Sequence, residues 1–212
     1  MMKQIKDFVT KQAITAMPQV LFKGRVIVVS SVSDANKAVD YLNGQQRVGV
    51  DTETRPSFRP GLRHKVALLQ LSTEDVCFLF RLNKIGIPDK LADFLQNGVL
   101  KIGLSLKDDF IMLTRRKKMN PTKGEWVELQ LYVQRFGIKD LSLQKIYANL
   151  FGQRIAKSQQ LTNWEADTLS KNQALYAATD AWACLRIYEE LQKLDQTNGY
   201  RLMVTKTKDS AP

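Results

Sequence analysis

The sequence predicts an α/β domain in which helices pack on a β-sheet. Three observations support this prediction: short β-branched runs recur in the first half of the chain, amphipathic segments alternate with them, and helical segments dominate the second half. The chain has 212 residues, of which 44% are hydrophobic and 25% charged, so it can bury the core of one such domain.

The expected strands are rich in β-branched and aromatic residues and are bounded by turn residues. The runs "RVIVVS" and "RVGVD" come first, and "VALLQLS" and "VCFLF" are separated by only a short polar turn. A loop with two prolines and a glycine, residues 54–65, follows the second strand. The expected strands cover residues 25–30, 47–51, 66–72, 76–80 and 99–104.

The expected helices carry apolar residues at spacings of three and four. One of them ends in "RRKK" and is expected to stop before Asn120-Pro121, because proline cannot continue a helix. The last helix begins where Ser170 and Gln173 fit a capping box. The expected helices cover residues 33–43, 89–97, 107–118, 142–152 and 170–194, and residues 125–137 should pass from a short strand or turn into a helix.

Charge and composition narrow the possible functions. The formal net charge of +11 favours a polyanionic partner, usually nucleic acid and less often an acidic membrane surface, although a merely basic soluble protein explains it equally well. Cys77 and Cys184 lie in apolar runs and are expected to be free core thiols, and a single histidine, His64, argues against a zinc site. Without an apolar span long enough for a bilayer or a secretory signal core, we expect a cytoplasmic protein with no membrane partner.

Two carboxylates stand close together at the end of the second expected strand. Asp51 and Glu53 flank Thr52, and residues two apart on a strand share one face. Two like charges are therefore held side by side next to an apolar segment. Such carboxylates raise each other's pKa and destabilise the fold unless a cation neutralises them.

A second carboxylate element lies inside the last expected helix. Asp180 sits in the apolar run "ALYAATDAWAC", and no basic residue lies three or four positions away. Its charge must therefore pair with a distant Arg or Lys or face a site where something else supplies positive charge. Tyr176 lies one turn earlier on the same helical face, and taken alone it is better explained as a core aromatic residue.

A third acidic element, "SLKDDF", opens the helix expected over 107–118. Ser105 and Asp108 fit a capping box, which leaves Asp109 without a structural role beside the apolar stripe of the helix, although Asp108 stays an alternative. Three separate segments thus offer carboxylates that can converge. Oxygen ligands select Mg²⁺ or Mn²⁺, and two such ions about 3.5–4 Å apart are the arrangement used for phosphoryl transfer.

Three sequence motifs, taken together, resemble those of a known family. "VGVDTETR", "IGLSLKDDF" and "LYAATDAWACLRIY" resemble, in order, the three exonuclease motifs of the DEDD 3′–5′ exonucleases. The spacing of Tyr176 and Asp180 is similar to that of the DEDDy subgroup, and "KVALLQLS" and "KSQQLTNW" look most like ribonuclease D and the exonuclease domain of the Werner-syndrome helicase. The resemblance implies an exonuclease domain over 24–193, with an N-terminal extension over 1–23 and a C-terminal tail over 194–212.

The resemblance also implies a fold and a set of site residues. It implies an RNase H-like fold, with a mixed central β-sheet flanked by helices. Asp51 would bridge two ions, Glu53 and Asp180 would hold the ion that activates water, and Asp109 would serve the second ion. Tyr176 would orient the attacking water. Since neither a helicase nor the helical domains that follow the nuclease domain in ribonuclease D are present in the sequence, we expect a stand-alone exonuclease.

A single-stranded 3′ end of DNA or RNA is the expected partner, and cations should line its path. The side chain of Thr52 should point away from the metal face while its backbone approaches the terminal nucleotide. "RRKK" at 115–118 is better explained as the positive end of its helix than as a phosphate site. The residues expected to bind nucleic acid are Thr52, Arg55, Phe58, Arg59, Arg63 and Lys157, although an ordinary solvated loop also explains those between 55 and 63.

The sequence therefore predicts a metal-dependent 3′–5′ exonuclease that releases nucleoside monophosphates from single-stranded or frayed 3′ ends. A non-catalytic nucleic-acid-binding module that retains the same fold is the main alternative. The complete set of four carboxylates together with Tyr176 favours the enzyme.

Overall fold

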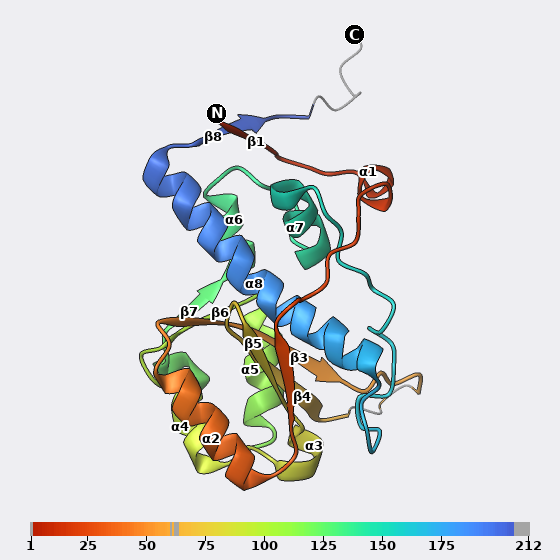
Figure 1. Ribbon diagram of the computed structural model, residues 1–212, viewed down its shortest axis with the longest axis vertical. Coiled ribbons are helices and arrows are strands. Elements are labelled where there is room, and N and C mark those ends of the chain that lie inside the picture. The colour runs from red at the N-terminus through yellow and green to blue at the C-terminus, as the bar shows by residue number, and fades with distance from the viewer. Residues whose placement is uncertain (1, 60, 62–63, 206–212) are drawn as a thin grey trace.

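The centre of the molecule is a six-stranded mixed β-sheet (Figure 1). The computed structural model describes residues 2–59, 61 and 64–205. The strand order is β2-β5-β4-β3-β6-β7, in which β4 is antiparallel to both of its neighbours and the other pairs are parallel. The strands are β2 (Arg25–Val29), β3 (Arg47–Thr54), β4 (Val66–Ser72), β5 (Val76–Phe80), β6 (Leu100–Gly103) and β7 (Trp126–Glu128). The predicted mixed sheet flanked by helices is confirmed.

Strand β3 is the structural support of the acidic residues. It continues three residues beyond the predicted end, so Asp51 and Glu53 lie within the strand and pair with Gln70 and Leu68 of β4. The extra length follows from this antiparallel pairing, which gives the polar residues of β3 backbone partners that the local sequence does not reveal. A bulge between Glu53 and Thr54 then disrupts the register where the chain leaves the sheet.

The long helix α8 (Lys171–Thr197) crosses one face of the sheet (Figure 1). The predicted capping box of Ser170 and Gln173 is present at its start. At Gly49 of β3 the helix approaches the strand so closely that a Cβ atom would lie 1.9 Å from the carbonyl oxygen of Ala181. Only glycine permits this contact, which brings the middle of α8 down onto β3 beside Asp51.

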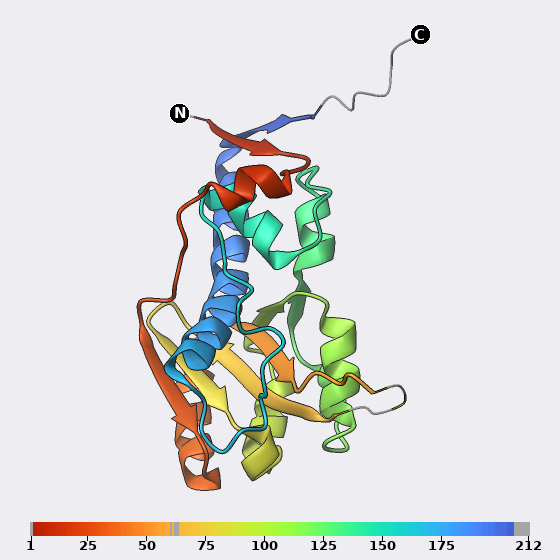
Figure 2. The same cartoon turned by 90° about the vertical axis from the view of Figure 1, so that its right-hand side faces the viewer.

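The remaining helices cover the sheet and its ends (Figures 1 and 2). They are α2 (Val32–Asn43), α3 (Leu82–Ile85), α4 (Asp89–Leu95), α5 (Leu106–Thr114), α6 (Leu129–Gln134), α7 (Leu143–Phe151) and the 3₁₀ turn η1 (Pro121–Lys123). The apolar residues of α2 and α4 form one core with the inward side chains of β3, β4 and β5, and those of α6, α7 and α8 form a second. Cys77 and Cys184 are free and buried, as predicted.

Helix α5 is shorter than the sequence predicts. It ends at Thr114, so no basic residue lies in its last turn, and residues 115–118 directly follow its last helical residue. Two contacts draw the chain off the helical path: Nε of Arg116 donates to the carbonyl oxygen of Val66 at 2.6 Å, and Lys117 forms an ion pair with Asp89. Tertiary contacts of these basic side chains therefore override their helical propensity.

The two ends of the described chain pair with each other. Strands β1 (Lys3–Lys6) and β8 (Tyr200–Met203) form a parallel two-stranded sheet next to α1 (Lys11–Thr15), and none of the three was predicted (Figure 1). The carboxylate of Asp7 accepts hydrogen bonds from the backbone and side chain of Thr205. Segments this short carry too little hydrophobic periodicity to be recognised individually. No helix within the described part of the chain is long and apolar enough to cross a membrane.

Candidate active site

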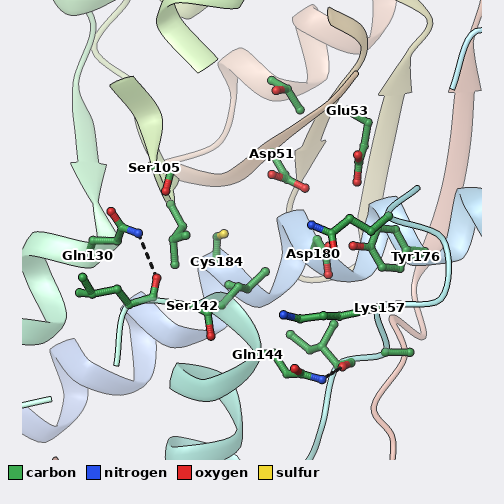
Figure 3. Close-up of a pocket in the computed structure, with 17 residues that line it drawn as sticks. Asp51, Glu53, Ser105, Gln130, Ser142, Gln144, Lys157, Tyr176, Asp180 and Cys184 are labelled. Carbon is green, nitrogen blue, oxygen red and sulfur yellow. Dashed lines mark hydrogen bonds between the residues drawn. The ribbon is translucent and has the colours of Figure 1, made fainter. Parts of the chain in front are cut away.

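Three carboxylates from two elements converge at one end of a pocket (Figure 3). Asp51 and Glu53 come from one face of β3, and Asp180 comes from the side of α8 that packs against that face. Each offers an oxygen atom, and these atoms lie within 4.8 Å of one another. Tyr176, one turn before Asp180, points into the same space (Figure 3). The site thus depends on the close packing of α8 on β3.

The carboxylate cluster is buried and rich in negative charge. Burial, followed by the charges of Asp180 and Asp109, raises the pKa of Glu53 to about 9. Burial also raises the pKa of Asp180 to about 7, against the opposing effects of a hydrogen bond with Tyr176 and the charge of Lys157. The pKa of Asp51 lies well above its ordinary value, because Asp51 is removed from water and faces the other acids. Without a bound cation, ionising all of these buried carboxylates therefore lowers the stability of the folded protein.

The donor set fits a hard divalent cation. All three groups supply oxygen ligands, which Mg²⁺ and Mn²⁺ prefer. Oδ1 of Asp180 is buried and has no hydrogen-bond partner among the described residues. An unsatisfied buried acceptor of this kind is expected where a ligand completes the site. Lys157 extends toward the cluster from the opposite side of the pocket (Figure 3). Its side chain is exposed, and its single positive charge is too little to neutralise three carboxylates.

Asp109 of α5 lies beside the cluster but is not one of its three members. Its Oδ1 accepts a hydrogen bond from Oγ1 of Thr52 at 2.5 Å, and burial raises its pKa to about 7 although this bond opposes the shift. Because side chains alternate along a strand, Thr52 points to the face of β3 opposite Asp51. The side chain of Thr52 thus supports an acidic residue, a role that the sequence did not indicate. Asp108 is exposed, whereas Asp109 is half-buried.

The start of α5 is held by a residue that sequence reasoning missed. The predicted capping box is wrong: the side chain of Ser105 makes no capping bond, and its backbone has φ 64°. Instead, the carboxylate of Glu128 accepts hydrogen bonds from the backbone N–H groups of Ser105 at 3.0 Å and Leu106 at 2.7 Å. The parallel register of β6 and β7, with Gly103 opposite Glu128, brings this carboxylate to the helix N-terminus. No local signal indicates a cap supplied from another strand.

The pocket itself has a volume of about 390 Å³ and extends from the acidic cluster toward α7. Its acidic end contains Asp51, Glu53 and Asp180. Its other end combines apolar side chains with amides and hydroxyls, from Leu104, Ser105, Gln130, Leu141, Ser142, Leu143, Gln144 and Ile155. Such a mixture suits a ligand with both a flat apolar part and polar groups.

The residues expected to bind nucleic acid lie in different surroundings. Phe58 is 81% exposed and Arg59 is exposed, both on the loop after β3. Nη1 of Arg55 lies 3.4 Å from Oε2 of Glu165, which ties this loop to the segment before α8. Of the remaining expected residues, Lys157 lines the pocket and Arg63 lies outside the described residues.

Comparison with known proteins gives three findings. The sequence model of a family described as 3′–5′ exonuclease matches residues 26–195. The mouse (Mus musculus) bifunctional 3′–5′ exonuclease/ATP-dependent helicase WRN is 28% identical over 198 residues, which cover 85% of this chain and 14% of that protein. The crystal structure of the Aedes aegypti Nibbler EXO domain has a TM-score of 0.72 and 25% identity, covering 87% of this chain and 95% of that one.

A more distant structure has the same fold. Escherichia coli RNase D superposes with a TM-score of 0.72 at 18% identity, covering 82% of this chain and 46% of that chain. This chain therefore spans only part of the mouse protein and of the bacterial one.

Proposed function

Because this chain belongs to the 3′–5′ exonuclease family and is a hydrolase of phosphodiester bonds, we propose that it releases nucleoside monophosphates from single-stranded or frayed 3′ ends with two divalent metal ions. The observation that carries this proposal is the convergence of Asp51, Glu53 and Asp180 within 4.8 Å. A structural cluster of this kind would be expected to contain paired arginines or lysines. Among the described residues, Lys157 is the one basic residue that lowers the pKa of any of the three.

In this proposal each carboxylate has a role toward the metal ions. Asp51, Glu53 and Asp180 would hold the ions together with Asp109, whose orientation is set by Thr52. When bound, Mg²⁺ or Mn²⁺ supplies positive charge for the developing phosphate charge and lowers the pKa of water. Glu128 contributes indirectly, since it fixes the first turn of the helix that carries Asp109.

Tyr176 positions the nucleophile in this proposal and does not remove its proton. Burial and the neighbouring acids Asp180 and Glu53 raise the pKa of its hydroxyl above the ordinary value near 10, so it stays neutral at physiological pH. A neutral hydroxyl can donate one hydrogen bond and accept another, which suits it to orient a water beside Asp180.

Replacing Tyr176 with phenylalanine is therefore expected to reduce kcat about 100-fold with little change in KM, because a positioned proton donor or acceptor contributes at about this level. Steady-state kinetics on a labelled oligonucleotide measure both constants. Tyr41→Phe, on an exposed site of α2, is the matched control and should behave like the wild type. A tyrosine with a purely structural role would change the melting temperature and leave kcat within about threefold.

Digestion of an end-labelled oligonucleotide tests the proposed function directly. In Mg²⁺ or Mn²⁺ we expect a ladder of products shortened from the 3′ end together with nucleoside monophosphates, and in EDTA we expect intact substrate, since the carboxylates alone cannot neutralise the developing charge. Chromatography identifies the mononucleotides. A non-catalytic binding module would retain the oligonucleotide and leave it uncut under all conditions. Cleavage that persists in EDTA would overturn the metal dependence. Matched DNA and RNA strands in the same assay identify the preferred sugar.

A further inference from the structure

The four consecutive basic residues at 115–118 have separate surroundings in the structure. Arg116 is engaged with the carbonyl oxygen of Val66, and Lys117 with Asp89. Lys118 is exposed on the surface, away from the groove described below. Arg115 is exposed as well, and the one side-chain hydrogen bond that its guanidinium group makes among the described residues is to Sδ of Met112 at 3.6 Å. Arg115 therefore presents a guanidinium group that the fold itself does not use.

Arg115 lines a groove between α5 and the loop that follows β3. The groove has a volume of about 420 Å³. One wall is formed by the loop and the other by one side of α5, and the lining residues are Thr54, Arg55, Ser57, His64, Asp108, Ile111, Met112 and Arg115. Thr54 directly follows Glu53, and Asp108 directly precedes Asp109, so two of the lining residues are chain neighbours of acidic residues at the proposed active site.

The chemistry of the groove suits a phosphodiester backbone. Arg55 and Arg115 stand on opposite walls, and Ile111, which is 41% exposed, provides an apolar surface with Met112. Arginine binds phosphate with a planar set of donors, and apolar side chains pack against sugars and bases. Asp108 is the one acidic residue in the lining, against the guanidinium groups of Arg55 and Arg115.

The side chains that line the catalytic pocket offer little positive charge to a polyanionic strand. Lys157 is the one basic residue that lines this pocket, so further affinity for a polyanion has to come from cations elsewhere on the path. The ion pair of Arg55 with Glu165 at 3.4 Å is between partly exposed side chains and can be exchanged for a phosphate at low cost. Arg115 forms no ion pair among the described residues, so no protein carboxylate has to be displaced before it binds a phosphate.

We propose that this groove binds the phosphodiester backbone of the nucleic acid strand upstream of the 3′ nucleotide, with Arg115 as the contact from α5 and Arg55 as the contact from the loop. The proposal rests on the proposed exonuclease function for the position of the 3′ end. It assigns to Arg115 a role in binding long substrates and none in the chemical step. A dinucleotide has no backbone phosphate upstream of the one that is cleaved, so its cleavage does not depend on Arg115.

Substrate length provides the test. For Arg115→Ala we expect KM to rise about tenfold on a strand of about twelve nucleotides, with kcat unchanged, since the variant cannot form the charge-assisted hydrogen bond to phosphate. On a dinucleotide, the variant and the wild type should be equal. Lys118→Ala, which removes another exposed cation three residues away that does not line the groove, is the matched control and should retain wild-type KM on both substrates. Because the Arg115 side chain is exposed, the melting temperature should not change.

Binding without cleavage separates this inference from the proposed function. Fluorescence anisotropy of the labelled long strand in EDTA should show weaker binding for Arg115→Ala, and the slope of log Kd against log salt should fall by about 0.7, because one phosphate fewer is neutralised by the protein. If Arg115→Ala and Lys118→Ala bind and cleave long strands equally well, the groove assignment is wrong while the exonuclease function stands. If no variant cleaves but Arg115→Ala alone binds less tightly, the catalytic proposal fails and the groove remains.

Discussion

Asp51→Asn is expected to reduce the rate of 3′-end cleavage by about 1,000-fold or more, which corresponds to about 4 kcal/mol of transition-state stabilisation. Asp51 is the residue whose charge interacts with all three other acids, Glu53, Asp180 and Asp109. Asparagine keeps the shape of the side chain but cannot carry the charge that holds two cations. Single-turnover cleavage of an end-labelled oligonucleotide at saturating Mg²⁺ measures the decrease.

The same variant also separates an effect on chemistry from an effect on folding. Removing one charge from a buried, like-charged cluster should raise the melting temperature of the metal-free protein, whereas a damaged fold would lower it. Asp93→Asn, at an exposed position on α4, is the matched control and should keep wild-type activity. A variant at Asp51 that retains more than about a tenth of the wild-type rate would show that the carboxylate is not essential to the mechanism.

Without divalent metal, the free energy of unfolding is expected to fall by several kcal/mol as the pH rises from about 5 to about 9. In the folded protein the pKa values of Asp109 and Asp180 are raised to about 7, and that of Glu53 to about 9. In the unfolded chain these groups titrate near pH 4. Between the two ranges the folded protein binds more protons than the unfolded chain, so raising the pH favours unfolding.

Urea unfolding in EDTA at several pH values measures this decrease, and added Mg²⁺ should reduce it, because the ions bind only the deprotonated carboxylates of the folded protein. Asp51→Asn should flatten the profile by removing one member of the repelling set. A free energy of unfolding that rises over the same interval would mean that the cluster is neutralised by protein cations. That result would also remove the electrostatic basis for a metal site.

Much of the fold could be predicted because its signals are local. The strands from β2 to β6 are short β-branched or apolar runs, and the capping box at Ser170 fixes the start of α8. The spacing of Asp51 and Glu53 places them on one face of a strand, and that of Tyr176 and Asp180 places them on one face of a helix. These relations depend only on the periodicity of each element.

The predictions that were wrong or missing concern contacts between distant segments. Helix α5 ends early because Arg116 and Lys117 find partners elsewhere in the fold. Strands β1 and β8 form only because the two ends of the described chain meet. The cap of α5 comes from Glu128, which the pairing of β6 with β7 brings into place. In each case the two partners are so far apart in the chain that no local sequence pattern indicates their contact.

The sequence by itself determined the kinds of element, the spacing of the acidic residues within each segment and the sign of the net charge, since backbone periodicity and side-chain chemistry are properties of short segments. Only the tertiary structure decided which groups meet: that Asp180 joins Asp51 and Glu53, that Asp109 turns to Thr52, and that Arg115 alone among four neighbouring cations faces the groove. The physical reason is strand register and helix packing, which depend on contacts between residues far apart in the chain and place each side chain to within a few ångströms.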